Sequence, residues 1–329
     1  MKTPLRRAFF ILTPALLLAG CASAPKPESA PPATASVVPA TSTPATETAF
    51  PARTEVYRAP PQAFPPGTPL ASRITQIALR EHAAWYQPFI DTAGRLASRR
   101  VAEAERSKLH DGDEPWARVA SYWRDSGTLA EMVASDQPGA YHCQNPYGST
   151  FARNECRAFI VDAAWSAAFV SYVMAKAGVP GFRHSPRHMD YIRAAYRGNG
   201  PYAYSDPNTT PVAPGDLLCY LRNNGAIPGH GGLNSFLASS SAGMASHCDI
   251  AVAIHDRQVW LVGGNVANMV TLRKIMLDPQ GRALLPRPIS NEWVPSDEDG
   301  QSPTCSPANE AACSMSRQNW AVLLKLRET

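Results

Sequence analysis

The sequence contains few charged residues, no CxxC pair, no internal repeat and no basic excess once its first residues are set aside. Charged residues make up 18% of the chain, and the formal net charge is +4. Residues 1–20 hold three basic residues and no acid, so removing them leaves 28 basic against 27 acidic residues. A nucleic-acid-binding domain keeps a basic stripe, so we expect no nucleic-acid partner. Without a CxxC pair, zinc binding is also disfavoured.

A long hydrophobic run is missing as well. The apolar stretch at residues 8–18 is interrupted by Thr13 and Pro14, and it is too short for a transmembrane helix. It follows a basic start and ends in Leu-Ala-Gly-Cys at residues 18–21, an order typical of an export signal. The apolar fraction of the whole chain, 44%, is nevertheless sufficient for a packed core.

The motif that ends at Cys21 resembles the bacterial lipoprotein box, in which the cysteine is diacylated and becomes the mature N-terminus. The resemblance implies a signal peptide at residues 1–20 and a membrane anchor at Cys21. With Ala22 behind the cysteine, it implies an outer-membrane lipoprotein that faces the periplasm. The alternative is an ordinary secretory signal with a chance cysteine.

Proline is concentrated after the signal. Of 31 prolines, 12 lie between Ala22 and Pro69, together with many Ala, Ser and Thr residues and no apolar period. We therefore expect residues 21–69 to form a disordered tether.

Residues 70–138 are predicted to form an N-terminal helical extension. Apolar residues recur at helical spacing near residues 74–85, and residues 97–109 form a weaker, charged candidate helix. Residues 115–124 form the third, with Pro115 suited to its first turn. Packing of this layer on the main domain is the preferred interpretation, and a separate binding module is the alternative.

Residues 139–329 are expected to contain helices first and an antiparallel sheet afterwards, which indicates an α+β domain. One helix is predicted at residues 162–176 and a second from Ser185, the N-cap, to Tyr196. The end of the chain, residues 320–326, fits either a strand or a short helix. Four strands are predicted at residues 216–221, 247–254, 258–262 and 270–275, with a Gly/Ser-rich loop at 223–246.

Six cysteines remain besides Cys21, and six allow fifteen pairings. Closeness in sequence favours Cys143 with Cys156 and Cys305 with Cys313, which leaves Cys219 to pair with Cys248 across two adjacent strands. A catalytic role for the Cys156 thiol is the competing interpretation.

The segment Asp162-Ala-Ala-Trp-Ser-Ala-Ala-Phe169 resembles the first helix of the CHAP and NlpC-type peptidoglycan hydrolases, which have a papain-like fold. The similarity continues in Pro214-Gly-Asp-Leu217, in His247 before an apolar strand, and in Gly263-Gly-Asn265 after the next strand. A closer resemblance, over residues 70–275, is to a bacterial family of unknown function. It covers the AAWSAAF and SPRHMDYI helices and the PGDLLC and SHCDIAV strands.

This resemblance implies a nucleophile at position 166, a catalytic histidine at His247 and an orienting residue at Asn265, with Asp249 as a nearby alternative. The hydrolases have cysteine where this chain has Ser166. A serine hydroxyl is not ionised at neutral pH, so it needs a true general base. The alternatives are non-catalytic: Ser166 is a packing or surface serine, His247 only flanks a disulfide, and Asn265 is a turn residue.

Two histidines on or beside the second helix, His184 and His188, are four residues apart. They suggest a metal pair, but the nearest acid, Asp190, points to another helix face, so we interpret both as polar cleft or surface residues. We expect no metal and no cofactor.

The leading hypothesis is a lipid-anchored hydrolase of peptidoglycan amide bonds, either an endopeptidase or an amidase. The alternative is a catalytically inactive lipoprotein that binds or organises the envelope on the same fold.

Overall fold

The computed structural model describes residues 58–222, 227–288 and 305–327. The predicted signal peptide, Cys21 and the tether up to residue 57 lie outside the described residues.

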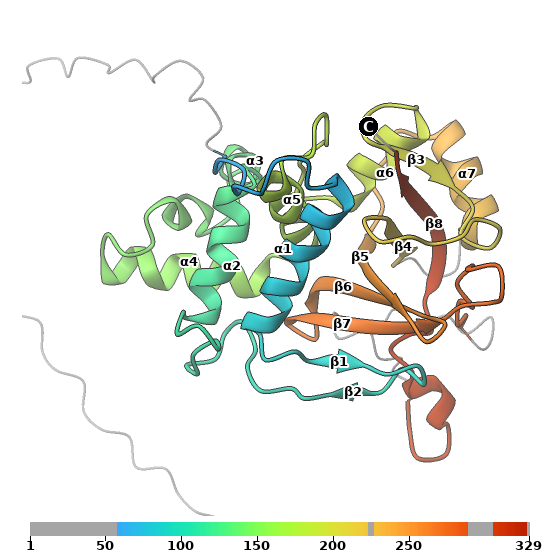
Figure 1. Cartoon of the computed structure of the whole chain (residues 1–329). Coiled ribbons are helices and arrows are strands. Elements are labelled where there is room, and N and C mark those ends of the chain that lie inside the picture. The colour runs from blue at the N-terminus through green and yellow to red at the C-terminus, as the bar shows by residue number, and fades with distance from the viewer. Residues whose placement is uncertain (1–57, 223–226, 289–304, 328–329) are drawn as a thin grey trace, which may run out of the picture. The chain divides into compact units, whose positions relative to one another are not determined.

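The described chain forms an α+β fold in which one mixed, eight-stranded sheet is covered by helices (Figure 1). The helices are α1 (Leu70–Ala84), α2 (Pro115–Asp125), α3 (Leu129–Ala134), α4 (Thr150–Asp162), α5 (Ser166–Ala177), α6 (His188–Tyr196) and α7 (Gly229–Ser239), with 3-10 helices η1 (Ala140–Gln144) and η2 (Glu310–Cys313). The strands are β1 (Phe89–Ile90), β2 (Leu96–Ala97), β3 (Tyr202–Ser205), β4 (Leu217–Leu221), β5 (Ser246–His255), β6 (Gln258–Val266), β7 (Met269–Met276) and β8 (Asn319–Leu326).

The strand order in the sheet is β2-β1-β7-β6-β5-β4-β8-β3. All neighbours are antiparallel except β1 and β7, which run parallel. The four strands predicted from sequence are confirmed, and β5, β6 and β7 form the expected meander. The C-terminal segment is a strand, β8, which lies between β4 and β3.

Three helix predictions need correction. Residues 97–109 are not helical, because the backbone there pairs elsewhere: the Glu103 N–H donates to the carbonyl of Asn268. The helix predicted from residue 162 begins at Ser166, since residues 150–162 form a separate helix, α4, capped by Ser149. The second predicted helix begins at His188, because the backbone of Arg187 is still extended, with φ −127° and ψ 125°; the Ser185 hydroxyl accepts from Arg187 N and donates to Asp190.

The predicted loop at 223–246 also holds a helix that the sequence did not indicate. α7 occupies residues 229–239 and buries Leu233 and Leu237 against the core. Glycine and serine are poor helix formers, so tertiary packing rather than propensity stabilises this helix.

Two hydrophobic clusters lie on the two faces of the sheet. The main cluster joins α1, α2 and α5 to one face, and it draws on residues from both sides of the predicted boundary at 138/139. The second cluster includes Leu218, Tyr220, Leu261 and Trp320, and it contains no residue of these three helices. Successive residues of a strand point to opposite faces, so β4 alternates between the clusters, with Cys219 in the first and Tyr220 in the second.

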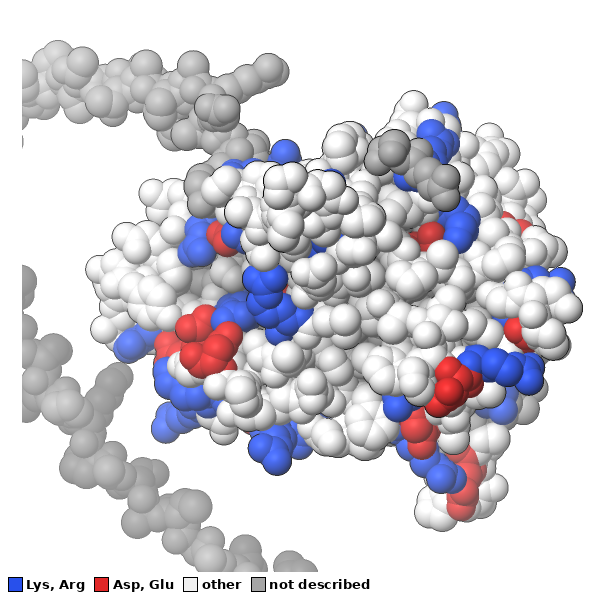
Figure 2. Space-filling view, viewed as in Figure 1, with Lys and Arg blue, Asp and Glu red and all other residues white. Residues whose placement is uncertain are grey.

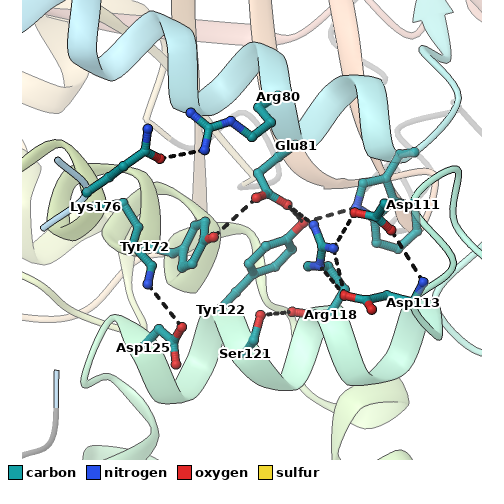
Figure 3. A network of polar contacts seen from close by, with 12 residues as sticks. Arg80, Glu81, Asp111, Asp113, Arg118, Ser121, Tyr122, Asp125, Tyr172 and Lys176 are labelled. Carbon is teal, nitrogen blue, oxygen red and sulfur yellow. Dashed lines mark hydrogen bonds and ion pairs between the residues drawn. The ribbon is translucent and has the colours of Figure 1, made fainter. Parts of the chain in front are cut away.

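A buried polar network joins α1, α2 and α5 around Glu81 (Figure 3). Its carboxylate accepts from the hydroxyls of Tyr122 and Tyr172, at 2.7 and 3.1 Å, and from Arg118 at 3.0 Å. Arg118 also reaches Asp111 and Asp113. These three partners are all donors, so the network joins the helices of this layer without leaving the charge unpaired.

The three predicted disulfides are confirmed: Cys143–Cys156, Cys219–Cys248 and Cys305–Cys313. The first joins η1 to α4, and the second links directly opposed residues of β4 and β5. Cys156 is therefore bonded and is not a free nucleophile.

Packing begins before Leu70, where the tether was predicted to end. The Ala59 N–H donates to the carbonyl of Asp125 and the Gln62 N–H to that of Lys176. Residues 58–69 therefore run as a strap across the C-terminal ends of α2 and α5, where helix carbonyls lack partners within the helix.

On the face shown in Figure 2, basic and acidic side chains lie among large uncharged areas. Among the residues that the structure describes, no single helix is long and apolar enough to cross a membrane; α4 and α5 pass that test only as a pair, bent by 105°.

Candidate functional site

The site is built at the N-terminal end of α5. Trp165 precedes the helix, stacks on Trp85 and donates from its indole nitrogen to Glu103 at 2.6 Å. This fixes the chain just before Ser166, the first residue of α5. Ser166 is only 3% exposed, so it is not a helix-surface serine.

The hydroxyl of Ser166 has an imidazole as its partner. Ser166 Oγ lies 2.6 Å from Nε2 of His188, which is on α6, and the other ring nitrogen, Nδ1, contacts the hydroxyl of Tyr191. Burial lowers the pKa of His188 well below its ordinary value, and nearby His247 and Arg222 lower it further. His188 is therefore neutral at pH 7, and one of its nitrogens is free to accept a proton.

His247 lies next to this pair but has other partners. Its Nε2 lies 2.8 Å from Asp249 Oδ1, its Nδ1 lies 3.4 Å from Arg222, and its ring stacks on Tyr220. Burial lowers the pKa of His247, although Asp249 opposes this. Burial raises the pKa of Asp249, but the opposing effects of His247 and Arg273 are larger together, and the pKa is lowered.

The expected contact between Ser166 and His247 is replaced in the structure by one between Ser166 and His188. The reason is the alternation of side chains along β5. His247 lies opposite Tyr220 in the register, so both side chains point to the face of the sheet that carries the second cluster. The helix α5 packs on the other face, where Phe169 approaches Gly264. The rings of His188 and His247 are 5.2 Å apart, so the His188 ring lies next to both Ser166 and His247.

Asn265 does not orient His247 in this structure. It is 2% exposed, has a φ of 55° and leaves its side-chain oxygen without a hydrogen-bond partner in the described part of the chain. Asparagine tolerates this left-handed backbone conformation, which is common in turns, so the position fits a turn residue. The carboxylate of Asp249, the alternative considered from sequence, holds the position beside His247.

His184 and His188 do not form a metal pair. His184 Nδ1 bonds the carbonyl of Ser171, whereas His188 points to Ser166. Asp190 bonds Ser185 and Arg187. Within residues 58–222, 227–288 and 305–327, no three His, Cys, Asp or Glu side chains gather as metal ligands would.

The Pro-Gly-Asp-Leu turn has a structural function. The carboxylate of Asp216 accepts from the backbone N–H groups of Ala213 and Leu326 and from Lys325 Nζ. It therefore fastens β8 beside β4, and burial raises its pKa despite these donors.

Sequence reasoning missed His188 and Tyr191 as partners of Ser166. The two residues are three apart on α6, and that spacing places them on the same face of a helix. The sequence did contain one indication of this site, namely an imidazole and a phenol three residues apart on one predicted helix and a serine at the start of another.

The comparisons with known proteins give one match. Residues 110–326 match the family DUF2272, described as an uncharacterized protein conserved in bacteria. No curated protein and no solved structure matches the chain. The match covers more than half of the sequence, and it includes Ser166, His188, His247 and Asp249. The chain therefore belongs to this family of uncharacterized bacterial proteins, DUF2272.

Proposed function

We propose that this protein is a lipid-anchored cell-envelope hydrolase that cleaves amide bonds of peptidoglycan, as an endopeptidase or an amidase. The observation that carries the proposal is the 2.6 Å contact between Ser166 Oγ and His188 Nε2 at the start of α5. A serine within hydrogen-bond reach of a neutral imidazole has the arrangement of an activated nucleophile.

The proposed reaction uses His188 as general base, in place of His247. With the ring proton on Nδ1, donated to the Tyr191 oxygen, Nε2 of His188 accepts the proton of Ser166 as Oγ attacks the carbonyl carbon. The imidazolium then protonates the leaving amine, which departs as the C–N bond breaks. Water hydrolyses the resulting acyl-serine by the same route and regenerates the hydroxyl.

The helix field supports the negative charge that develops on the carbonyl oxygen. The first N–H groups of an α-helix have no acceptor within the helix, and the N-terminus carries a partial positive charge. In α5 these groups belong to Ser166 and the residues directly after it. We assign them the oxyanion during attack.

The substrate class follows from the resemblance to papain-like peptidoglycan hydrolases and from the predicted anchor. A lipid at Cys21 and a proline-rich tether place the domain near the envelope, on the periplasmic face of the outer membrane. Three disulfides suit an oxidising compartment. No cofactor takes part in the proposed reaction.

One observation favours a second function, the binding or scaffolding of envelope components without catalysis. Ser166 is 3% exposed and His188 is 4% exposed, so a substrate reaches them only after neighbouring residues move. A protein that merely retains the fold has no need for such access.

The test is release of peptides from purified sacculi by the full chain, alongside labelling of Ser166 by a fluorophosphonate. We expect Ser166→Ala to abolish release and labelling, and His188→Ala to reduce both by roughly a hundredfold or more because the base is lost. Ser121→Ala is the matched control, since that partly buried hydroxyl lies on α2 and donates to the carbonyl of Arg118.

Absence of both release and label in the wild-type chain contradicts the hydrolase proposal and favours the binding function. Labelling that stays at the wild-type rate in His188→Ala contradicts the assignment of the base.

A further inference from the structure

His247 is one of five buried side chains that contact one another in a closed cycle. Its imidazole bonds Asp249, whose second oxygen lies 3.2 Å from Arg273 Nε. The Arg273 guanidinium lies over the ring of Trp320, Trp320 meets Tyr220 edge-on, and Tyr220 stacks on His247 at 5.0 Å. These residues come from β4, β5, β7 and β8, so four strands fix one imidazole.

Gly263 on β6 has no side chain, and this leaves room for the contact between Asp249 and His247. A Cβ at this position would lie 1.9 Å from Asp249 Oδ1 and 3.0 Å from His247 Nε2. β6 lies between β5, which carries Asp249, and β7, which carries Arg273. A side chain at residue 263 would therefore displace the carboxylate from the imidazole.

The fixed ring of His247 lies directly against His188. Their centroids are 5.2 Å apart and their planes are inclined by 48°. The two nitrogens of His188 are taken by Ser166 and Tyr191. A flat ring beside His188 limits the rotation of that imidazole away from the serine.

We propose that His247 is a positioning residue: its aromatic ring, fixed by Asp249, Arg273, Trp320 and Tyr220, keeps His188 aimed at Ser166. This inference rests on the proposed function of the Ser166–His188 pair. It assigns to His247 a steric action through His188 rather than a proton transfer of its own. The other charged group that faces His247 is Arg222, which lies at its Nδ1.

The decisive experiment compares His247→Ala with His247→Phe in the full chain. Phenylalanine retains a flat ring against Tyr220 and His188 but has no nitrogen, whereas alanine removes the ring. We expect His247→Ala to slow fluorophosphonate labelling of Ser166 roughly 10- to 100-fold, because a poorly aimed base is costly. We expect His247→Phe to retain most of the wild-type rate.

Nitrogen-15 NMR of the histidine rings gives a readout that does not require activity. We expect one tautomer of His188 in the wild-type chain and in His247→Phe, and a mixture in His247→Ala. If the wild-type chain is not labelled at all, the hydrolase proposal fails, yet these spectra still test the positioning. A His188 signal unchanged in His247→Ala overturns it. Equal losses of labelling in both variants also overturn it and make His247 a chemical participant.

Gly263→Ala is a second variant, and it keeps all five side chains. A Cβ at residue 263 would lie 1.9 Å from Asp249 Oδ1 and 3.0 Å from His247 Nε2, so it displaces the imidazole as well as the carboxylate, and we expect the same direction of change as in His247→Ala. Gly243→Ala is its control, because a Cβ there meets nothing within 4 Å. If Gly263→Ala melts like the wild-type chain and leaves the spectra of His247 and His188 unchanged, the proposed positioning of His188 by the His247 imidazole is contradicted.

Discussion

Replacing Glu81 with alanine is expected to lower the free energy of unfolding by about 3–5 kcal/mol. The carboxylate is buried and accepts from Tyr122, Tyr172 and Arg118. Its removal leaves the buried Tyr122 hydroxyl and the partly buried Tyr172 hydroxyl without their acceptor, and Arg118 without its most buried counter-charge. Urea denaturation of the full chain with its disulfides intact measures the change.

Two further variants give the scale of this effect. Glu81→Gln keeps an acceptor but loses the charge, so we expect an intermediate loss of about 1–3 kcal/mol. Glu310→Ala breaks an ion pair with Arg95 whose side chains are 76% and 78% exposed, and we expect less than about 0.5 kcal/mol. A loss below about 1 kcal/mol in Glu81→Ala would show that the network is not what joins the three helices.

The parts of the fold that the sequence predicted have strong local patterns. β5 and β6 follow short apolar runs with turn residues between them, and α2 begins at Pro115 as the sequence indicates. Residues 97–109 carry charge at a spacing close to helical, but the backbone of Glu103 bonds Asn268 far along the chain. A contact of that separation is not encoded in any local window, so such a segment is not predictable from periodicity.

The sequence indicated Ser166 at the start of a helix, but it did not indicate His188 as the partner of the Ser166 hydroxyl. The alternation Cys248, Ile250, Val252 assigns the larger apolar side chains of β5 to one face, which leaves His247 and Asp249 on the other. That alternation places the two polar residues together, and the structure confirms this. It does not say which face α5 covers, because the choice depends on how the helices pack on the finished sheet.

Acid is expected to destabilise the folded protein steeply below about pH 6.5, the ordinary pKa of histidine. Burial is the main cause that lowers the pKa of His184 to about 4, with Arg58 adding to it. Between these two pH values the unfolded chain binds a proton that the folded chain does not, so the free energy of unfolding falls as pH falls. His184 alone accounts for roughly 3 kcal/mol by pH 4, and it contributes almost nothing above pH 7.

The pKa values of His82, His188 and His247 are lowered as well, each mainly by burial. As the pH falls, each of them therefore lowers the free energy of unfolding further, in addition to the effect of His184. His184→Asn isolates one of the four, since the amide nitrogen retains a donor for the carbonyl of Ser171. Urea titrations at a series of pH values from 7.5 to 5 give the free energy of unfolding as a function of pH. We expect its slope in this variant to be smaller than in the wild-type chain by up to about 1.4 kcal/mol per pH unit, which corresponds to one proton. Equal slopes in the two proteins would mean that His184 takes up its proton without unfolding, which requires water to reach the ring in the native state.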